Sequence, residues 1–448
     1  MSNNIVLKKG LNIPLQGEAA LKTVKTIKPD VVALKPTDFK GLLPRLLVRE
    51  GDKVLAGSPL MADKQHPDIL FTSPVSGTVS GIVRGEKRKL LEVCVKADET
   101  QEFLDFGKKD IASLKAEDLK DLLKKSGLWA AIVQRPYGVL ADPEAKPKAI
   151  FISAFNTAPL AADTAYVLGD EVGYVQAGVD ALSKLTDGGV HLSVPENSPF
   201  AKISNVKTHV VTGKHPAGNV GVQISHISPI RKGEIVWTVS LLMTAAIGKL
   251  LKEGKLNLSR KVAVTGPVAK DPAYVDAFPG MSMKEIASFC DNSKDDVRFV
   301  SGDCLTGTNV GKDGYLGFFD NQITLLHEGT ERELLGWANP IRSKQFSFSK
   351  AYLSWLTPKK KYAIDTNTHG GPRAFVVSDV YGKVLPMDIF PIYLVKACLA
   401  GDIDNMEKYG IYEVLPEDLA LCEYVDPSKN DIQSIVESGI NLMIKEMS

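Results

Sequence analysis

Short apolar pairs alternate with turn residues along residues 48–82, and this spacing restricts the fold more than any other feature of the chain. Glu50, Gly51 and Asp52 form a turn signal before the strand-like Lys53–Leu55, and Ser73–Pro74 separates the strands that follow. Apolar runs this short are typical of strands, because an amphipathic helix needs a longer periodic stretch. We therefore predict a small all-β sandwich of hairpins.

The same segment resembles the lipoyl/biotinyl domain type, whose pattern is E-G-D-x-V-x-x-G-x-x-L followed by S-P-x-S-G. Lys64 follows Asp63 near the place where such a domain would carry a lipoyl-lysine. However, Gln65–Asp68 lengthens this hairpin beyond a tight turn. Lys64 is therefore either a lipoylation site or an unmodified lysine of a structural sandwich, and the longer hairpin favours the second interpretation.

Residues 148–255 alternate buried strands with helical stretches, which indicates a doubly wound, Rossmann-like α/β domain. Lys148–Phe155 is a continuous apolar run of strand length, and Val190–Val194 and Val206–Val211 are further strands. Ligands of such folds bind at the carboxyl edge of the strands. The first turn there, Ala154–Pro159, has no glycine, so close backbone approach to a pyrophosphate is disfavoured.

The most apolar stretch of the chain is Ile235–Ile247. It is shorter than the roughly 20 residues that a bilayer-spanning helix needs, so we predict a buried helix. Met1–Gly10 has no basic start followed by an apolar core, so no signal peptide is expected. Any membrane association is expected to run through partners.

The rest of the chain divides into β-rich and helical parts. One helix near Met283–Phe289 among several strands suggests a β-grasp fold, and Asp431–Met447 has a helical apolar stripe. The predicted parts are an N-terminal strand with a lipoyl/biotinyl-like β-sandwich (1–100), a helical connector (101–147), the Rossmann-like α/β domain (148–255), a β-grasp, SLBB-like domain (256–330) and a C-terminal helical domain (331–448).

Charge and cysteine content exclude some classes of function. The chain has 54 Lys and Arg against 53 Asp and Glu, without the basic excess of a nucleic-acid-binding protein. Its 5 cysteines are widely spaced, with no C-x-x-C, which favours a reducing compartment over a disulfide framework. Cys304 only loosely resembles a reactive-cysteine site, and the cysteines are expected to be small core residues.

A search for independent chemistry finds weak signals. G-x-G-x-x-G, G-x-x-x-x-G-K-[ST] and G-x-S-x-G are absent, and no histidine pair has the spacing of a zinc helix, so no metal site is predicted. The glycine-rich Thr306–Gly317 is either an anion cradle or a turn between strands. His215, in H-P-A-G, and His369, in H-G-G-P, are each either ligand-binding or ordinary loop histidines.

The order of these parts resembles one superfamily, which contains the flavin-bearing subunit of respiratory complex I and its relatives in the Rnf complex. Within it, the chain is most similar to the NqrA family, which forms the A subunit of the Na⁺-translocating NADH:quinone oxidoreductase. The segments that carry this resemblance are Gly10–Gly17, Gly51–Pro59, Phe71–Gly77, Arg84–Arg88, Gly213–Gly218, Arg298–Gly307, Tyr315–Glu328 and Glu417–Cys422.

The resemblance also points to what this chain lacks. Flavin-bearing relatives have a glycine-rich loop where this chain has Gly127–Pro136, which holds a single glycine. Relatives with an iron–sulfur cluster group four thiolates in the helical tail, whereas here only Cys398 and Cys422 lie there, far apart. The resemblance therefore implies a chain without a cofactor of its own, in a complex that uses NADH, flavins, iron–sulfur, quinone and Na⁺.

The family implies a peripheral position on the cytoplasmic face of the bacterial inner membrane, within a complex of six subunits and chiefly against its membrane-embedded NqrB. There the chain would support quinone reduction coupled to Na⁺ export, without catalysis by the isolated chain. If quinone contacts it, His215 and Arg298 are the candidate anchors in a mostly apolar pocket. The alternatives are a stand-alone module that binds a small ligand with its β-grasp domain, and a lipoyl-dependent carrier.

Overall fold

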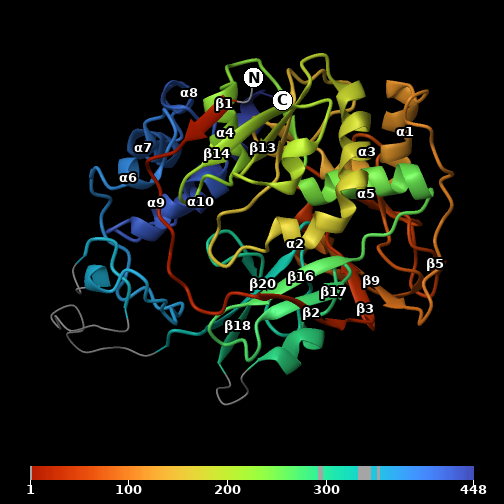
Figure 1. Ribbon diagram of the computed structural model, residues 1–448, viewed down its shortest axis with the longest axis horizontal. Helices are drawn as coiled ribbons and strands as arrows, with labels where there is room; N and C mark the ends of the chain where they lie inside the picture. The colour runs from red at the N-terminus through yellow and green to blue at the C-terminus, as the bar shows by residue number, and fades with distance from the viewer. Residues whose placement is uncertain (1–2, 291–295, 331–344, 351–353, 448) are drawn as a thin grey trace.

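Four sheets and a C-terminal group of helices make up the described part of the chain (Figure 1). The computed structural model describes residues 3–290, 296–330, 345–350 and 354–447. In Figure 1 the N-terminal sandwich lies at the lower right, a six-stranded mixed sheet at the bottom and the C-terminal helices at the left, around a central sheet. Both ends of the chain lie at the top of this view.

Two antiparallel sheets form the predicted sandwich and confirm an all-β unit of hairpins. One sheet has the order β3-β9-β8-β5 and the other β4-β6-β7. Their inner faces share a core that includes Leu60, Met61, Phe71 and Val79. The strands are β3 (Val31–Leu34), β4 (Pro44–Leu46), β5 (Lys53–Val54), β6 (Pro59–Asp63), β7 (Leu70–Thr72), β8 (Gly77–Arg84) and β9 (Leu90–Ala97). Lys64 is exposed in the hairpin between β6 and β7.

A seven-stranded sheet of order β1-β14-β13-β12-β15-β10-β11 forms the centre of the molecule. The first five strands are parallel, and β10 and β11 are antiparallel additions at one edge. The strands are β1 (Asn3–Val6), β10 (Val133–Arg135), β11 (Val139–Leu140), β12 (Ile150–Ser153), β13 (Val190–Val194), β14 (Lys207–Thr212) and β15 (Val236–Thr238). The helices of this part are α2 (Thr164–Leu168), α3 (Val172–Leu182), α4 (Val220–Ile227) and α5 (Leu241–Glu253).

The apolar run Ile235–Ile247 was expected to be one buried helix, and this prediction is wrong. The run divides into β15 and α5. Ser240 separates them because its hydroxyl accepts a hydrogen bond from the backbone N–H of Met243 and caps the helix. Both pieces are buried, so apolar composition alone could not distinguish strand from helix.

The predicted β-grasp part contains most of a six-stranded mixed sheet of order β19-β18-β20-β16-β17-β2. A short 3₁₀ helix at Met283–Phe289 contributes to its core through Met283 and Ile286. The strands are β2 (Ala20–Thr26), β16 (Arg260–Thr265), β17 (Ala273–Ala277), β18 (Val297–Ser301), β19 (Thr308–Asn309) and β20 (Gln322–His327). The structure shows a mixed α/β arrangement, and the specific β-grasp and Rossmann-like assignments stay predictions.

The N-terminal strands lie outside the sandwich with which the sequence grouped them. β1 pairs in parallel with β14, and β2 pairs in parallel with β17, so residues before β3 bridge two other sheets. In Figure 1 the segment between β1 and β2 runs from the top of the view, past the C-terminal helices, to the mixed sheet at the bottom. Edge strands such as β14 and β17 offer unpaired backbone groups, which a distant segment can satisfy without a local sequence signal.

The connector contains less helix than predicted. Its single α-helix in the described chain is α1 (Ala116–Ser126), and β10 and β11 join the central sheet. Asp110 ends the preceding segment in a turn, because its carboxylate accepts hydrogen bonds from Ala112 N–H and the Ser113 hydroxyl. Ile111 and Leu114 therefore do not extend α1.

The predicted C-terminal unit is helical from Tyr381 onwards, whereas the described residues 345–350 and 354–380 contain only a short 3₁₀ helix at Ser354–Leu356; residues 331–344 and 351–353 of the expected unit lie outside the described residues. Its helices are α6 (Tyr381–Val384), α7 (Pro391–Ala400), α8 (Ile403–Tyr409), α9 (Ala420–Val425) and α10 (Ile432–Met447). The stripe on α10 is confirmed, because Ile432, Val436, Ile440 and Met443 are buried. Within the described ranges, no helix has both the length and the apolar character needed to cross a bilayer.

Candidate functional site

The carboxyl ends of the central parallel strands meet where the strand order reverses. The chain runs from β12 through β13 to β14 and then returns to place β15 on the opposite side of β12. Such a switch point is the usual ligand position in open α/β sheets. The polar residues gathered here come from the turn after β12, the loop after β14 and the N-terminal segment.

His215 lies at the centre of this edge and is only 2% exposed. Its Nδ1 lies 3.1 Å from Thr157 Oγ1, and its backbone N–H donates to Asn12 Oδ1 at 2.9 Å. The His215 carbonyl accepts from the N–H of Leu11 at 2.9 Å. The N-terminal segment is thus tied over the loop that carries His215.

Thr157 joins His215 to the loop that carries Gly218. Thr157 Oγ1 accepts from Gly218 N–H at 2.9 Å and forms a second hydrogen bond with His215 Nδ1, in which either group can be the donor. The other ring nitrogen, Nε2, is buried and has no hydrogen-bond partner among the described residues. Burial lowers the pKa of His215 to about 4, against the opposing attraction of Asp303 and Asp418, so the ring is neutral at pH 7.

A second layer of contacts closes the space beside Thr157. Ser153 Oγ, at the end of β12, lies 3.0 Å from the Gly218 carbonyl and accepts from Gln223 Nε2 at 2.9 Å. A Cβ placed on Gly218 would come within 2.6 Å of the Thr157 backbone nitrogen, so only glycine fits there. The two loops are therefore in direct contact at the carboxyl end of β12.

A buried ion cluster connects this edge to the C-terminal helices. Arg135, only 2% exposed, donates to Asp418 Oδ2 at 3.1 Å through Nη1 and to Glu417 Oε1 at 2.6 Å through Nη2. Asp418 also accepts the Leu415 N–H at 3.0 Å. The cluster lies against the first turn of α4, where Gly221 leaves room for it.

Arg298, the other predicted anchor, lies elsewhere. It is at the start of β18, where Nε and Nη2 each donate to a carboxylate oxygen of Glu328 at 2.7 Å. The hydrogen bond from Arg298 is the main reason that the pKa of Glu328 is lowered. No hydrogen bond or ion pair in the described chain joins Arg298 to His215, so the structure does not bring the two predicted residues into one contact.

Two family models and several relatives match this chain. Residues 5–98 match the NqrA N-terminal barrel-sandwich hybrid domain, and residues 114–256 match the NqrA second alpha/beta domain. A protein from Rhodopirellula baltica, named as the A subunit of a Na(+)-translocating NADH-quinone reductase, is 35% identical over 98% of each chain. The chain belongs to the NqrA family. Further members with that name, from Yersinia pestis and Vibrio vulnificus, are 38% and 36% identical and cover 99% of this chain and all of their own length.

Solved structures add little to this NqrA-family assignment. The chain is similar to an NAD⁺-reducing [NiFe]-hydrogenase in the H₂-reduced state, with a TM-score of 0.38 and 9% identity. The match covers 75% of this chain and 62% of the hydrogenase chain. At that score the likeness supports no argument about fold or function.

The cysteines of this NqrA-family chain are held as thiols. Burial raises the pKa of Cys304 to about 12 and that of Cys398 to about 11, and burial also raises the pKa of Cys422. A reactive or metal-binding cysteine needs the thiolate, which these surroundings disfavour. In the described residues, no three His, Cys, Asp or Glu side chains are grouped as a metal site would require.

The remaining sequence candidates lie apart from His215. His369 is at the surface, where its ring is within 2.7 Å of Gln345 Nε2. The glycine-rich Thr306–Gly317 lies between β18 and β20 and contains the two-residue β19, and Asp303 accepts the N–H of Thr306 at its start. It lies where the turn interpretation expected it, and no anion-binding role follows from these contacts.

Sequence reasoning did not select several residues that surround His215 in this NqrA-family chain. Polar residues inside otherwise apolar elements were the available signal, as for Ser153 at the end of Ile150–Ser153 and Gln223 within Val220–Ile227. Thr157 gave no such signal, because it lies in a turn of mixed composition. Arg135 and Asp418 are far apart in the chain, so only the fold reveals their pairing.

Proposed function

We propose that the chain is the NqrA component of a Na⁺-translocating NADH–quinone reductase and that it works by contact, without a redox cofactor of its own. It would lie on the cytoplasmic face of the membrane, dock on the membrane-embedded NqrB and support quinone reduction coupled to Na⁺ export. The full-length similarity to relatives that bear this component's name supports the role in the complex.

The carboxyl edge of the central sheet is filled by the chain's own loops. This observation is the strongest support for a chain that binds no nucleotide. Gly218 lies against the turn that contains Thr157, and His215 closes the same space. A dinucleotide at a switch point needs that turn open, so that backbone N–H groups can contact its phosphates. Here the N–H of Gly218 already donates to Thr157.

His215 is the better of the two proposed quinone anchors. Its Nε2 has no partner among the described residues and, in the tautomer that carries the proton there, could donate to a quinone carbonyl, whereas Arg298 would first have to release Glu328. His215 is buried, so a quinone would reach it only if the N-terminal segment around Asn12 moved aside. The proposal therefore predicts that this segment opens in the assembled complex.

The test uses the complex with and without this chain. A tagged form should co-purify with NqrB, and membranes that lack the chain should lose Na⁺-stimulated quinone reduction by NADH until purified chain is added back. His215→Gln should lower quinone reduction in the complex, whereas His226→Gln, at an exposed histidine of α4, should not. Full activity without the chain would contradict its role in the complex. Full activity of His215→Gln would contradict only the proposal that His215 anchors quinone.

A further inference from the structure

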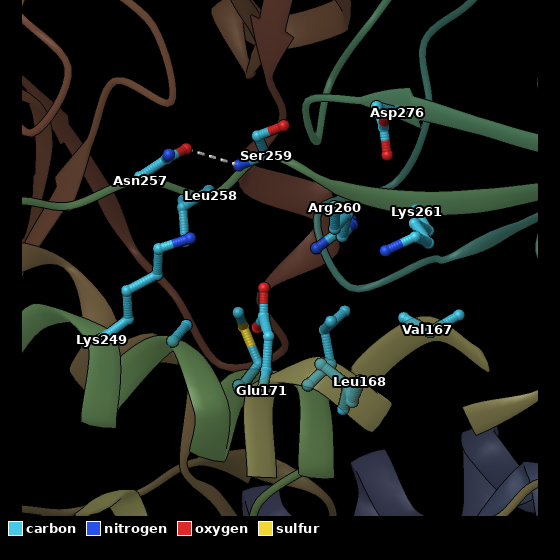
Figure 2. Close-up of a pocket in the computed structure, with 13 residues that line it drawn as sticks. Val167, Leu168, Glu171, Lys249, Asn257, Leu258, Ser259, Arg260, Lys261 and Asp276 are labelled. Atoms are coloured by element: carbon cyan, nitrogen blue, oxygen red, sulfur yellow. Dashed lines mark hydrogen bonds between the residues drawn. The ribbon is translucent and has the colours of Figure 1, made fainter. Parts of the chain in front are cut away.

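A partly open cavity of about 200 Å³ lies between the helices beside the central seven-stranded sheet and the six-stranded mixed sheet (Figure 2). Helices α2 and α5 form one wall, and β16 and β17 form the other. Its lining residues are Val167, Leu168, Glu171, Leu242, Met243, Ala246, Lys249, Asn257, Leu258, Ser259, Arg260, Lys261 and Asp276. None of them belongs to the site around His215.

Arg260 is the most unusual residue of this cavity. It is 7% exposed, and its Nη2 donates to the carbonyls of Gly317, Phe318 and Asp320 at 2.7–3.3 Å. Its Nε and Nη1 are buried and have no hydrogen-bond partner among the described residues. Leaving charged donors unpaired in this way costs free energy, and an anion in the neighbouring cavity would offset part of it through charge attraction.

Two lysines add positive charge to the same cavity. Lys249 projects from α5 and Lys261 from β16, and neither forms an ion pair within the described chain. Each lies near a tyrosine ring instead, with Lys249 Nζ 5.7 Å from the ring centre of Tyr174 and Lys261 Nζ 5.9 Å from that of Tyr166. The lining thus combines Arg260, whose charge Asp320 and Asp38 partly offset, with two lysines that form no ion pair in the described chain.

Two carboxylates limit what the cavity can accept. In Figure 2 the carboxylate of Glu171 points from the helical side towards Arg260 on the sheet side. Asp276 lies on β17 and accepts the Thr26 hydroxyl at 3.3 Å. Glu171 therefore lies near the cations without a hydrogen-bond partner in the described residues, where it would repel a bound anion.

We propose that this cavity binds a small organic anion through its carboxylate or phosphate group. Arg260 and the two lysines would hold the oxyanion, and the apolar wall that includes Leu168 and Met243 would contact the carbon skeleton. The cavity is smaller than the roughly 300–1,000 Å³ of drug-sized sites, so the occupant is a compact metabolite. The site is independent of the proposed quinone role.

Calorimetric titration of the purified full-length chain tests the site. Succinate and inorganic phosphate probe the two oxyanion classes, and uncharged succinamide is the size-matched control. We expect saturable binding of at least one anion with a dissociation constant near or below about 1 mM, and none of succinamide. Absence of binding by both anions, or equal binding of succinamide, would overturn the proposal.

Matched variants connect the binding to the cavity. Lys249→Gln should weaken the anion by roughly three- to tenfold, equivalent to up to about 1.4 kcal/mol. Lys252→Gln is its control, because Lys252 Nζ is also 5.7 Å from the Tyr174 ring centre on the same helix but does not line the cavity. Equal weakening by both variants would contradict a site at this position.

Glu171→Gln gives a test of opposite sign. Removal of this carboxylate should strengthen anion binding several-fold, whereas Asp170→Asn, at an exposed neighbour outside the lining, should change little. Unchanged or weaker binding by Glu171→Gln would contradict the proposed position of the anion. All these measurements use the chain alone. A negative binding result would therefore not bear on the proposed role in the complex, and a refuted role in the complex would not bear on anion binding.

Discussion

Arg135 and Asp418 are 283 positions apart in the chain and form a buried ion pair of 3.1 Å between Nη1 and Oδ2. The pair joins the edge of the central sheet to the C-terminal helices, directly beside the loop that carries His215. Both side chains are almost fully buried. Loss of either partner leaves the other as an uncompensated charge in a medium of low polarity.

Asp418→Ala should therefore destabilise the chain by about 3 kcal/mol, because Arg135 would keep only Glu417 as an anionic partner. Thermal unfolding of the purified chain measures this effect. Glu437→Ala is the control, since Glu437 is an exposed residue paired with Lys40 at 3.2 Å and should cost at most about 1 kcal/mol. Equal shifts in Tm for both variants would show that the buried ion pair contributes no more to stability than the exposed pair.

Gly221→Ala should also destabilise, although alanine usually favours a helix. A Cβ at Gly221 would come within 2.3 Å of both Arg135 Nη1 and Asp418 Oδ2, so the ion pair would have to move, at about 1–3 kcal/mol. Gly173→Ala, in α3, meets nothing closer than Lys252 Nζ at 3.7 Å and should stabilise by up to about 1 kcal/mol. Tm changes of the same sign for the two variants would contradict the close contact.

His215 should make stability depend on pH. Its folded pKa of about 4 lies below the ordinary value of 6.5, so the unfolded chain binds more protons between these values. Stability is then complete above pH 6.5 and falls as the pH approaches 4, by roughly 3 kcal/mol from this residue. Burial also lowers the pKa of His191 and His209, so the measurement compares wild type with His215→Gln, which should lose less stability on acidification. If stability changed with pH in the same way for wild type and His215→Gln, the lowered pKa of His215 would be excluded.

Lys64 should be unmodified. It is exposed in the hairpin between β6 and β7, which the residues Gln65–Asp68 lengthen beyond a tight turn. Intact-mass spectrometry of the chain isolated from its native cells should give the mass of the bare 48.5 kDa polypeptide. A mass increase located on Lys64 would instead support the lipoyl-dependent carrier.

Local periodicity predicted the parts of the fold that depend on nearby residues. The stripe of α10 and the hairpins of the sandwich follow from the spacing of apolar side chains within each element. The places of β1 and β2 could not be predicted, because their partners β14 and β17 lie about 200 residues or more further along the chain. Pairing at that distance depends on the completed sheets and leaves no periodic signal in the strand itself.

The candidate site was predictable in one residue. His215 is noticeable because H-P-A-G is an unusual loop sequence. Its contacts come from Thr157, 58 residues away, and Asn12, 203 residues away, which no local pattern connects. Arg298 was expected to be a second anchor, but its guanidinium is occupied by Glu328, which directly follows the antiparallel neighbour β20, a pairing that appears only in the fold.

The most direct test of action by contact alone is the absorbance spectrum and native mass of the purified chain, recorded without the other components of the complex. The account predicts a colourless protein whose native mass is that of polypeptide alone, in one or more whole copies, because the carboxyl edge around His215 and Gly218 is filled by the chain itself. A flavin or an iron–sulfur centre present at full occupancy in the isolated chain would contradict it.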